Sequence, residues 1–302
     1  MDVLSDVLDT LRLESTVFAH GELPAPWGIR TEAHGDFSFH IVAAGSCWLD
    51  VDGLPTVEVA SGDVVIVSRG RGHALRDARD TPVQPLEEFL ASGGFASRVG
   101  KGRGTSLVCG CFQLDGLPGD PLIGALPPLM HAKNLINDVA WLRESVSLLG
   151  HEATSEEPGA QTVVNRVCDA LFVYVLRRLL EELPRGDTSW LHALADAQLA
   201  AALRSIHDKP ADPWTVADLA ARAGMSRSAF AAHFMKMVGE APIEYLIRWR
   251  LRKAATMLRA TTAGIAEIAK TVGYDSEAAF SKAFKRSIGV TPGAFRRRAE
   301  AA

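Results

Sequence analysis

The sequence contains no apolar run long enough to cross a membrane, and its start lacks the basic residues and apolar stretch of a secretion signal. Both absences predict a cytoplasmic chain without a membrane partner. Cysteine is scarce as well, with four residues in 302. In a chain of this kind we expect reduced thiols and not a disulfide framework. The 47% of hydrophobic and 23% of charged residues are typical of a folded protein.

The charge is distributed unevenly along a chain that is long enough for two domains. The formal net charge is −4, which by itself argues against nucleic acid as a partner. However, 17 of the 32 Lys and Arg but only 9 of the 36 Asp and Glu lie from Leu199 onward. That part therefore carries +8 and the rest −12. A basic end attracts phosphate, whereas an acidic domain is repelled by it.

The first part of the chain predicts a short helix over residues 2–13 and then a set of antiparallel strands. Short apolar runs punctuated by Gly, Pro and Asp indicate a sandwich or a small barrel. The runs are Phe37–Val42, Cys47–Val51, Val57–Val59, Val64–Val67 and Ser106–Leu114.

The pattern becomes helical after Pro127–Pro128, with apolar residues three and four apart in Asn134–Leu149 and Thr162–Leu183. The long stripe in the second segment suits packing on its own domain or pairing with a partner helix in a homodimer. Its members are Val163, Val167, Leu171, Val175, Leu176 and Leu179. The polar stretch Pro184–Ser189 predicts a linker. We therefore expect an effector-sensing domain at 1–127, a dimerisation or linker region at 128–188, and a helical domain at 189–302.

An internal repeat dominates that last domain. Phe230 and Phe234 recur at an offset of 50 as Phe280 and Phe284, and Gly224 recurs at an offset of 49 as Gly273. Each copy has the parts of a helix-turn-helix: a short apolar helix, a glycine for a left-handed turn, a capping residue, and a second helix with two buried phenylalanines. The capping residue is Ser226 in the first copy and Asp275 or Ser276 in the second. Thr215 and Asp218 have the spacing of a capping box.

The face opposite the phenylalanines is expected to enter the major groove of double-stranded promoter DNA. In the first copy this face offers small and polar residues, with the last two nearer its side: Arg227, Ser228, Ala231, Ala232, His233 and Lys236. In the second copy it is more polar, which favours base recognition by hydrogen bonds: Glu277, Ala278, Ser281, Lys282 and Lys285.

The two motifs, their joining helix and the ending GVTPGAFRRR resemble the DNA-binding domain of the AraC/XylS family over about residues 196–298. The resemblance implies one monomer that places two recognition helices in successive major grooves, about 34 Å apart. It also implies a transcription regulator, commonly an activator, that works with RNA polymerase. A helical bundle without a DNA role is the alternative that the basic skew and the motif disfavour.

The strand-rich part resembles the cupin-type sensor domain found in one branch of that family. The matching segments are Phe39-His40, GSCWL at 45–49, Gly62-Asp63 followed by Gly70 and His73, and CGCF at 109–112. Ser68 stands where proline is usual, and the set of histidines plus a glutamate of cupin enzymes is reduced. The expected fold is thus α+β: an N-terminal cupin-like β-barrel with a helical hairpin, then an all-α domain with two helix-turn-helix units.

Four side chains are candidates for a metal or effector site: His40, His73, Cys109 and Cys111. Cys109 and Cys111 are two apart on a predicted strand and face the same side. Two imidazoles and two thiolates suit Zn²⁺ or another transition metal. The alternatives are buried structural cysteines with histidines on loops, or a redox switch in which a disulfide involves Cys47 or another chain.

Three functional readings follow from these residues. The first is a non-enzymatic DNA-binding regulator controlled by a small-molecule effector in the barrel. The second is a regulator that senses a metal or an oxidant. The third is a metal-dependent cupin oxygenase fused to a DNA-binding domain, which would show metal-dependent oxygen uptake.

Overall fold

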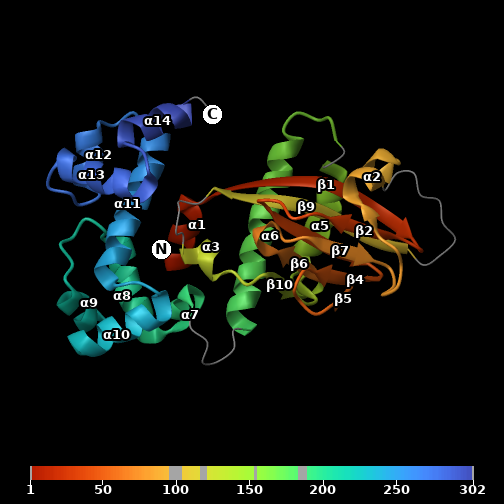
Figure 1. Ribbon diagram of the computed structural model, residues 1–302, viewed down its shortest axis with the longest axis horizontal. Helices are drawn as coiled ribbons and strands as arrows, with labels where there is room; N and C mark the ends of the chain where they lie inside the picture. The colour runs from red at the N-terminus through yellow and green to blue at the C-terminus, as the bar shows by residue number, and fades with distance from the viewer. Residues whose placement is uncertain (1, 95–103, 116–120, 153–154, 183–188, 301–302) are drawn as a thin grey trace. The chain divides into compact units, whose positions relative to one another are not determined.

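A computed structural model describes residues 2–94, 104–115, 121–152, 155–182 and 189–300 (Figure 1). The chain divides into two compact units. The strand-rich unit comprises Leu13–Leu114 and Leu126–Glu182, and the helical unit comprises Met1–Arg12, Asp115–Ala125 and Leu183–Ala302. The predicted segment 128–188 is thus not a separate unit, and two helices from the first 127 residues group with the C-terminal part. None of the helices in the described ranges is long and apolar enough to span a bilayer.

The strand-rich unit contains two five-stranded sheets. The first has, in order, β1 (Arg12–Pro24), β9 (Gly104–Asp115), β3 (Phe37–Ala44), β6 (Val64–Val67) and β10 (Leu129–Ala132). The second has β5 (Val57–Ala60), β4 (Ser46–Val51), β7 (His73–Arg76), β2 (Gly28–Thr31) and β8 (Gln84–Pro85). The five predicted strands are confirmed as β3, β4, β5, β6 and β9. The predicted two-domain architecture, a cupin-like β unit and a helical C-terminal unit, is confirmed.

Strand alternation sends side chains of both sheets into one shared core. On β3, His40 lies opposite Cys109 of β9 and Val65 of β6. Val65 and Cys109 join a buried cluster with Leu49 and Leu75 from the second sheet. The core therefore lies between the two sheets, with alternate residues facing inward.

A helical hairpin covers the other face of the first sheet. Its helices are α5 (Ala140–Glu152) and α6 (Ala160–Glu182), preceded by the short α4 (Leu135–Asp138). Phe112 of β9 packs against Phe172 of α6 with ring centroids 5.4 Å apart. Of the predicted α6 stripe, Leu171, Val175 and Leu176 are buried. Half of that six-residue stripe therefore packs on its own unit, whereas Val163 is exposed.

The helical unit contains both predicted helix-turn-helix motifs. Its C-terminal helices are α7 (Trp190–Ala195), α8 (Ala197–Asp208), α9 (Val216–Arg222), α10 (Arg227–Val238), α11 (Pro242–Ala260), α12 (Ile265–Thr271), α13 (Glu277–Ile288) and α14 (Pro292–Glu300). Two further helices, α1 (Val3–Thr10) and α3 (Pro121–Ala125), belong to the same unit. The predicted helix over residues 2–13 ends earlier, because β1 begins at Arg12.

A buried polar network joins α1 to α8 and α11. His207 is 1% exposed, stacks on Trp249 with centroids 3.9 Å apart, and its Nε2 lies 2.7 Å from the Tyr245 hydroxyl. Its Nδ1 is 3.5 Å from a carboxylate oxygen of Asp6. Burial, reinforced by Lys253, lowers the pKa of His207 to about 3, and burial raises the pKa of Asp6. The imidazole is therefore neutral at neutral pH, since burial outweighs the nearby carboxylate.

Candidate nucleic-acid interface and effector cavity

The two helix-turn-helix motifs are built by the local signals that the repeat predicts. The Ser226 hydroxyl accepts the amide of Ala229 at the start of α10, and Ser276 does the same for Ala279 at the start of α13. Both second helices end at a left-handed glycine, Gly239 with φ 85° and Gly289 with φ 86°. Thr215 and Asp218 form the predicted capping box at α9.

The buried face of each second helix orients its opposite face toward solvent. Phe230 and Phe234 of α10 are fully buried, as are Phe280 and Phe284 of α13. Most of the residues predicted to contact DNA are exposed: Arg227, Ser228, Ala232, Lys236, Glu277, Ala278, Lys282 and Lys285. Ala231 and Ser281 are half-buried at the edges of these faces. Two solvent-facing surfaces of the kind that enters a major groove are thus present.

His233 lies differently from the rest of its predicted group. Its Nε2 is 2.8 Å from Asp196 Oδ2, and Asp196 is also the N-cap of α8. This contact turns the imidazole toward its own unit. Its role in DNA recognition stays a prediction.

Among the exposed residues of the recognition helices that the predicted set left out, two have long side chains. Met235 of α10 is 46% exposed and occupies the position of Lys285 at the repeat offset of 50. Arg286 of α13 is exposed and occupies the position of Lys236. Extending the repeat alignment along the whole helix would have found both. Met235 was missed because an apolar residue is normally assigned to the core.

Between the two sheets lies a small cavity. Its volume is about 20 Å³, room for roughly one water molecule. Its walls are mainly apolar and come from strands of both sheets and from α2 (Leu86–Ala91). The lining residues are Phe18, Ala19, Ile29, Thr31, His40, His73, Leu75, Leu86, Leu107 and Cys109.

The polar part of this cavity is a pair of imidazoles. Nε2 of His40 is 2.8 Å from Nε2 of His73, and Nδ1 of His73 is 3.0 Å from the Arg71 carbonyl oxygen. A carbonyl only accepts, so His73 donates from Nδ1 and its Nε2 accepts from His40. Burial lowers the pKa of both histidines, and His73 lowers that of His40 further. Both rings are therefore neutral, and the buried Nδ1 of His40 is left as an acceptor without a partner among the described residues.

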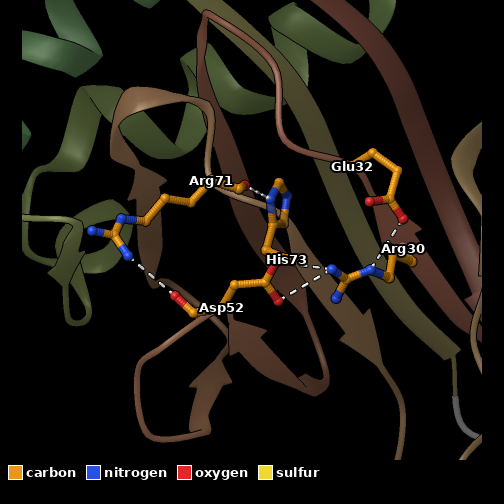
Figure 2. Close-up of polar contacts among 5 residues, drawn as sticks. All are labelled: Arg30, Glu32, Asp52, Arg71 and His73. Carbon is orange, nitrogen blue, oxygen red and sulfur yellow. Dashed lines mark hydrogen bonds and ion pairs between the residues drawn. The ribbon is translucent and has the colours of Figure 1, made fainter.

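A polar cluster at the surface fixes the orientation of His73 (Figure 2). Nη2 of Arg30 lies 2.9 Å and 3.1 Å from the two carboxylate oxygens of Asp52, while its Nε bonds Glu32. The Arg71 guanidinium donates to the Asp52 carbonyl, and the Arg71 carbonyl receives the His73 proton. The Arg30 hydrogen bond lowers the pKa of the Asp52 carboxyl. The tautomer of His73 is thus set by its attachment to the neighbouring turn.

The two candidate cysteines lie on the same face of β9, but only one reaches the cavity. Cys109 lines the cavity and is buried, which raises its pKa. Cys111 pairs with Ser38 further along the strand, is half-buried, and its pKa is raised by burial and then by Asp36. His40, His73 and Cys109 therefore line one cavity, while Cys111 lies elsewhere. Within the described residues no three His, Cys, Asp or Glu side chains are grouped closely enough to hold a metal ion.

The remaining cupin-like residues have structural roles. Asp63 accepts the amides of Ala60 and Asn134, and lies 2.8 Å from His131 Nε2. Ser68 is fully buried and its amide donates to the Pro128 carbonyl at 3.0 Å. Proline at position 68 would lack that donor. This hydrogen bond gives a physical reason for the departure from the cupin pattern.

Comparisons with known proteins agree with this geometry. A family model described as cupin matches residues 2–181, and one described as a helix-turn-helix domain matches residues 219–298. An AraC-like transcription regulator of Streptomyces lividans is 36% identical over 98% of each chain. The chain belongs to the AraC-like transcription regulators. As an AraC-like protein it is a DNA-binding transcription regulator with a cupin-like N-terminal domain.

Two further known proteins align with nearly the whole of this chain. The transcriptional regulator AlkR of Acinetobacter baylyi is 31% identical over 98% of this chain and 99% of its own. The solved structure of ToxT from Vibrio cholerae with a bound unsaturated fatty acid is 14% identical, covers 95% of this chain and 94% of that chain, and has a TM-score of 0.38.

Proposed function

We propose that this regulator is a cytoplasmic transcription activator whose affinity for promoter DNA is set by a small, mainly apolar effector in the cavity between the sheets. The observation that carries the proposal is the cavity itself, where apolar walls surround two neutral imidazoles. The Nδ1 acceptor of His40 favours an effector with one hydrogen-bond donor, such as a hydroxyl, an amide N–H or a protonated acid. As an activator, the DNA-bound protein would act on RNA polymerase.

The small size of the cavity supports a conformational change of its wall when the effector binds. In this state it has room for about one water, so a larger effector binds only when a wall moves outward. Leu86 of α2 is the single lining residue that a helix contributes among the described elements, and we propose that α2 is the wall that moves. A ligand that binds only the expanded state shifts the population toward that state.

Two strands of the cavity wall lead along the chain into the DNA-binding unit. β1 carries Phe18 and Ala19, and α1 ends one residue before it begins. β9 carries Leu107 and Cys109 and is followed by α3. Since α1 and α3 belong to the helical unit, displacement of either strand would be transmitted through the backbone.

A cavity-filling variant tests the effector proposal. The test ligands are a series of aliphatic alcohols, amides and acids of increasing length. Two responses of the full chain to each ligand are measured: the shift in melting temperature and the change in affinity for DNA. Ala19→Leu fills the cavity and is expected to abolish both responses while retaining DNA binding without effector. The control, Ala43→Leu, makes the same change at an exposed position of β3 and is expected to respond as the parent does. An unchanged response in Ala19→Leu would refute the cavity as the effector site.

Direct measurements distinguish the effector proposal from the two alternatives, metal sensing and enzymatic activity. Elemental analysis and native mass measurement of the purified protein report bound metal, bound ligand and subunit number together. Stoichiometric zinc, lost in Cys109→Ser, would favour the metal-sensing alternative. Metal-dependent oxygen uptake would favour the cupin oxygenase. We expect neither, because regulators dominate the relatives that span the whole chain.

We also propose a homodimer through the α5–α6 hairpin. Trp141, Leu148 and Val163 are 40%, 41% and 36% exposed, although they lie on helices whose other faces are buried. A two-fold axis pairs such a patch with itself. Exposed Glu144 and Arg166 give the hairpin both signs of charge, which suits pairing of two copies. Sedimentation of Leu148→Glu should yield a monomer where the parent yields a dimer; equal sizes would refute this interface.

A further inference from the structure

One helix, α11, packs against both helix-turn-helix units. Its first half packs on the first unit through the buried Tyr245, whose ring centroid lies 5.7 Å from that of Phe234. Its second half forms one core with α12 and α13 that includes Leu251, Phe280 and Phe284. The hydrophobic contacts of the two units are thus gathered at opposite ends of one 19-residue helix. Long helices curve gently, so contacts made directly between the two units hold the angle between them more firmly than α11 alone does.

One side chain at the middle of α11 supplies such contacts. The Arg250 guanidinium donates from Nε to the Pro210 carbonyl at 2.6 Å, and from Nη2 to Ala211 at 3.4 Å and Asp212 at 2.8 Å. These carbonyls lie between α8 and α9, at the entrance to the first unit. Nη1 donates to the Gly273 carbonyl at 3.0 Å, in the turn of the second unit. A single planar group therefore ties the backbones of both units together.

The turn of the second unit is shaped for this junction. Gly273 has φ 88°, and a Cβ on it would lie 2.7 Å from Ala211 Cα and 3.0 Å from Arg250 Cζ. The equivalent Gly224 of the first unit has φ 65°, and nothing lies within 4 Å of a Cβ there. Both glycines serve a left-handed turn, but only Gly273 also serves a close backbone approach. The close approach at Gly273 is therefore specific to the second unit, because the repeat alone would produce it at Gly224 as well.

We propose that Arg250 is a positioning residue that locks the two helix-turn-helix units and thereby makes the protein specific for the spacing of its two DNA half-sites. With the lock closed, α10 and α13 are presented at one separation and one angle. Inserting one base pair moves a half-site along the duplex and rotates it by about 35°. A rigid pair of units cannot follow that rotation, whereas a pair joined only by α11 can bend toward it.

The test measures affinity as a function of spacing. The full chain selects its two half-sites from random double-stranded DNA, and probes are then made with the spacing changed by one or two base pairs. The parent protein should lose about tenfold or more in affinity per inserted base pair, on the scale of one lost base contact. A parent that tolerates these insertions with less than about twofold loss would refute the lock without any variant.

Two variants of Arg250 and one matched control test whether this side chain joins the units. Arg250→Met should bind a single half-site as the parent does, bind the two-site probe about tenfold more weakly, and lose most of its spacing dependence, since four charge-assisted hydrogen bonds are removed. Arg250→Lys should show the same weak spacing dependence as Arg250→Met, because an ammonium cannot reach carbonyls on both sides. Arg248→Met removes an arginine that pairs with Glu240 within the first unit, and it should keep the parental spacing dependence.

The glycine pair provides an independent readout should Arg250→Met fail to fold. Gly273→Ala should relax the spacing dependence, whereas Gly224→Ala strains a similar backbone and should weaken binding without relaxing it. Folding of each variant is checked by circular dichroism at the temperature of the binding assay. Folded Arg250→Met or Gly273→Ala with the parent's spacing dependence would overturn the proposal.

Discussion

Lys282 is one of the positions at which the two recognition helices differ in charge. It is exposed on α13, and its counterpart in α10 is Ala232. Lys282→Ala makes the two helices alike at this point and leaves the buried face with Phe280 and Phe284 intact. We expect weaker DNA binding and a loss of preference confined to the half-site that α13 contacts.

The loss of DNA affinity in Lys282→Ala depends on what the Lys282 ammonium contacts. A lysine that donates to a guanine edge contributes about 1–3 kcal/mol of discrimination, which is about 5- to 150-fold in affinity. The recognition helices expose five cations, Arg227, Lys236, Lys282, Lys285 and Arg286. If all five met phosphates, they would contribute about −4.5 to the slope of log affinity against log salt. Loss of one phosphate contact alone would reduce that slope by about 1 and leave the sequence preference unchanged.

The assay compares sequence preference and salt dependence in the same variants. Selection from random DNA gives the preference at each position, and titration from about 50 to 200 mM salt gives the slope. Lys270→Ala is the control, since Lys270 is exposed on α12, outside the recognition helix. It should change only the slope. If Lys282→Ala keeps the parental preference at every position, α13 does not recognise bases through this residue.

Three further predictions concern stability and reactivity. Because burial holds the pKa of His207 near 3, the folded state resists protonation. Stability should therefore be complete above about pH 6.5 and fall by about 2 kcal/mol at pH 5, less the part offset by its acidic neighbour; urea unfolding of His207→Gln should lack this loss. Cys111 should react with thiol reagents before the three buried thiols, as measured by peptide mass; equal rates in the folded protein would contradict their burial. Ser68→Pro should lower the unfolding free energy by about 1–3 kcal/mol by leaving the Pro128 carbonyl unpaired, whereas Ser68→Ala keeps the amide and should be nearly neutral. Equal melting of these two variants would refute that explanation.

The helix-turn-helix repeat could be predicted because its signals are local. A capping serine, a left-handed glycine and two phenylalanines four apart each act within one or two turns. The sequence left Asp275 and Ser276 as alternative caps, and the structure selects Ser276. The Arg250 junction could not be predicted this way, since it joins carbonyls 23 to 40 residues away and depends on tertiary approach.

The candidate site in the strand-rich unit was predictable only in part. Strand alternation correctly placed Cys109 and Cys111 on one face of β9. However, positions two residues apart lie about 6.6 Å apart along the strand, and this distance places Cys111 beyond the cavity. Alternation determines the face of a sheet, whereas the position along the strand depends on register with β3, which the sequence does not encode locally.

The two recognition helices differ in kind, and Met235 sharpens the difference. At the repeat offset, Ala232 and Met235 of α10 stand where α13 has Lys282 and Lys285. Apolar side chains in a major groove contact thymine methyl groups and gain little from phosphate, while lysines can donate to guanine or to the backbone. At these two positions α10 should therefore depend on close fit and on the correct approach angle, whereas α13 can donate hydrogen bonds. The difference lies in where the charges stand, since Glu277 occupies the position of Arg227 and both helices carry a net charge of +2. A helix that recognises DNA by fit needs a rigid frame, which is what a lock between the two units provides.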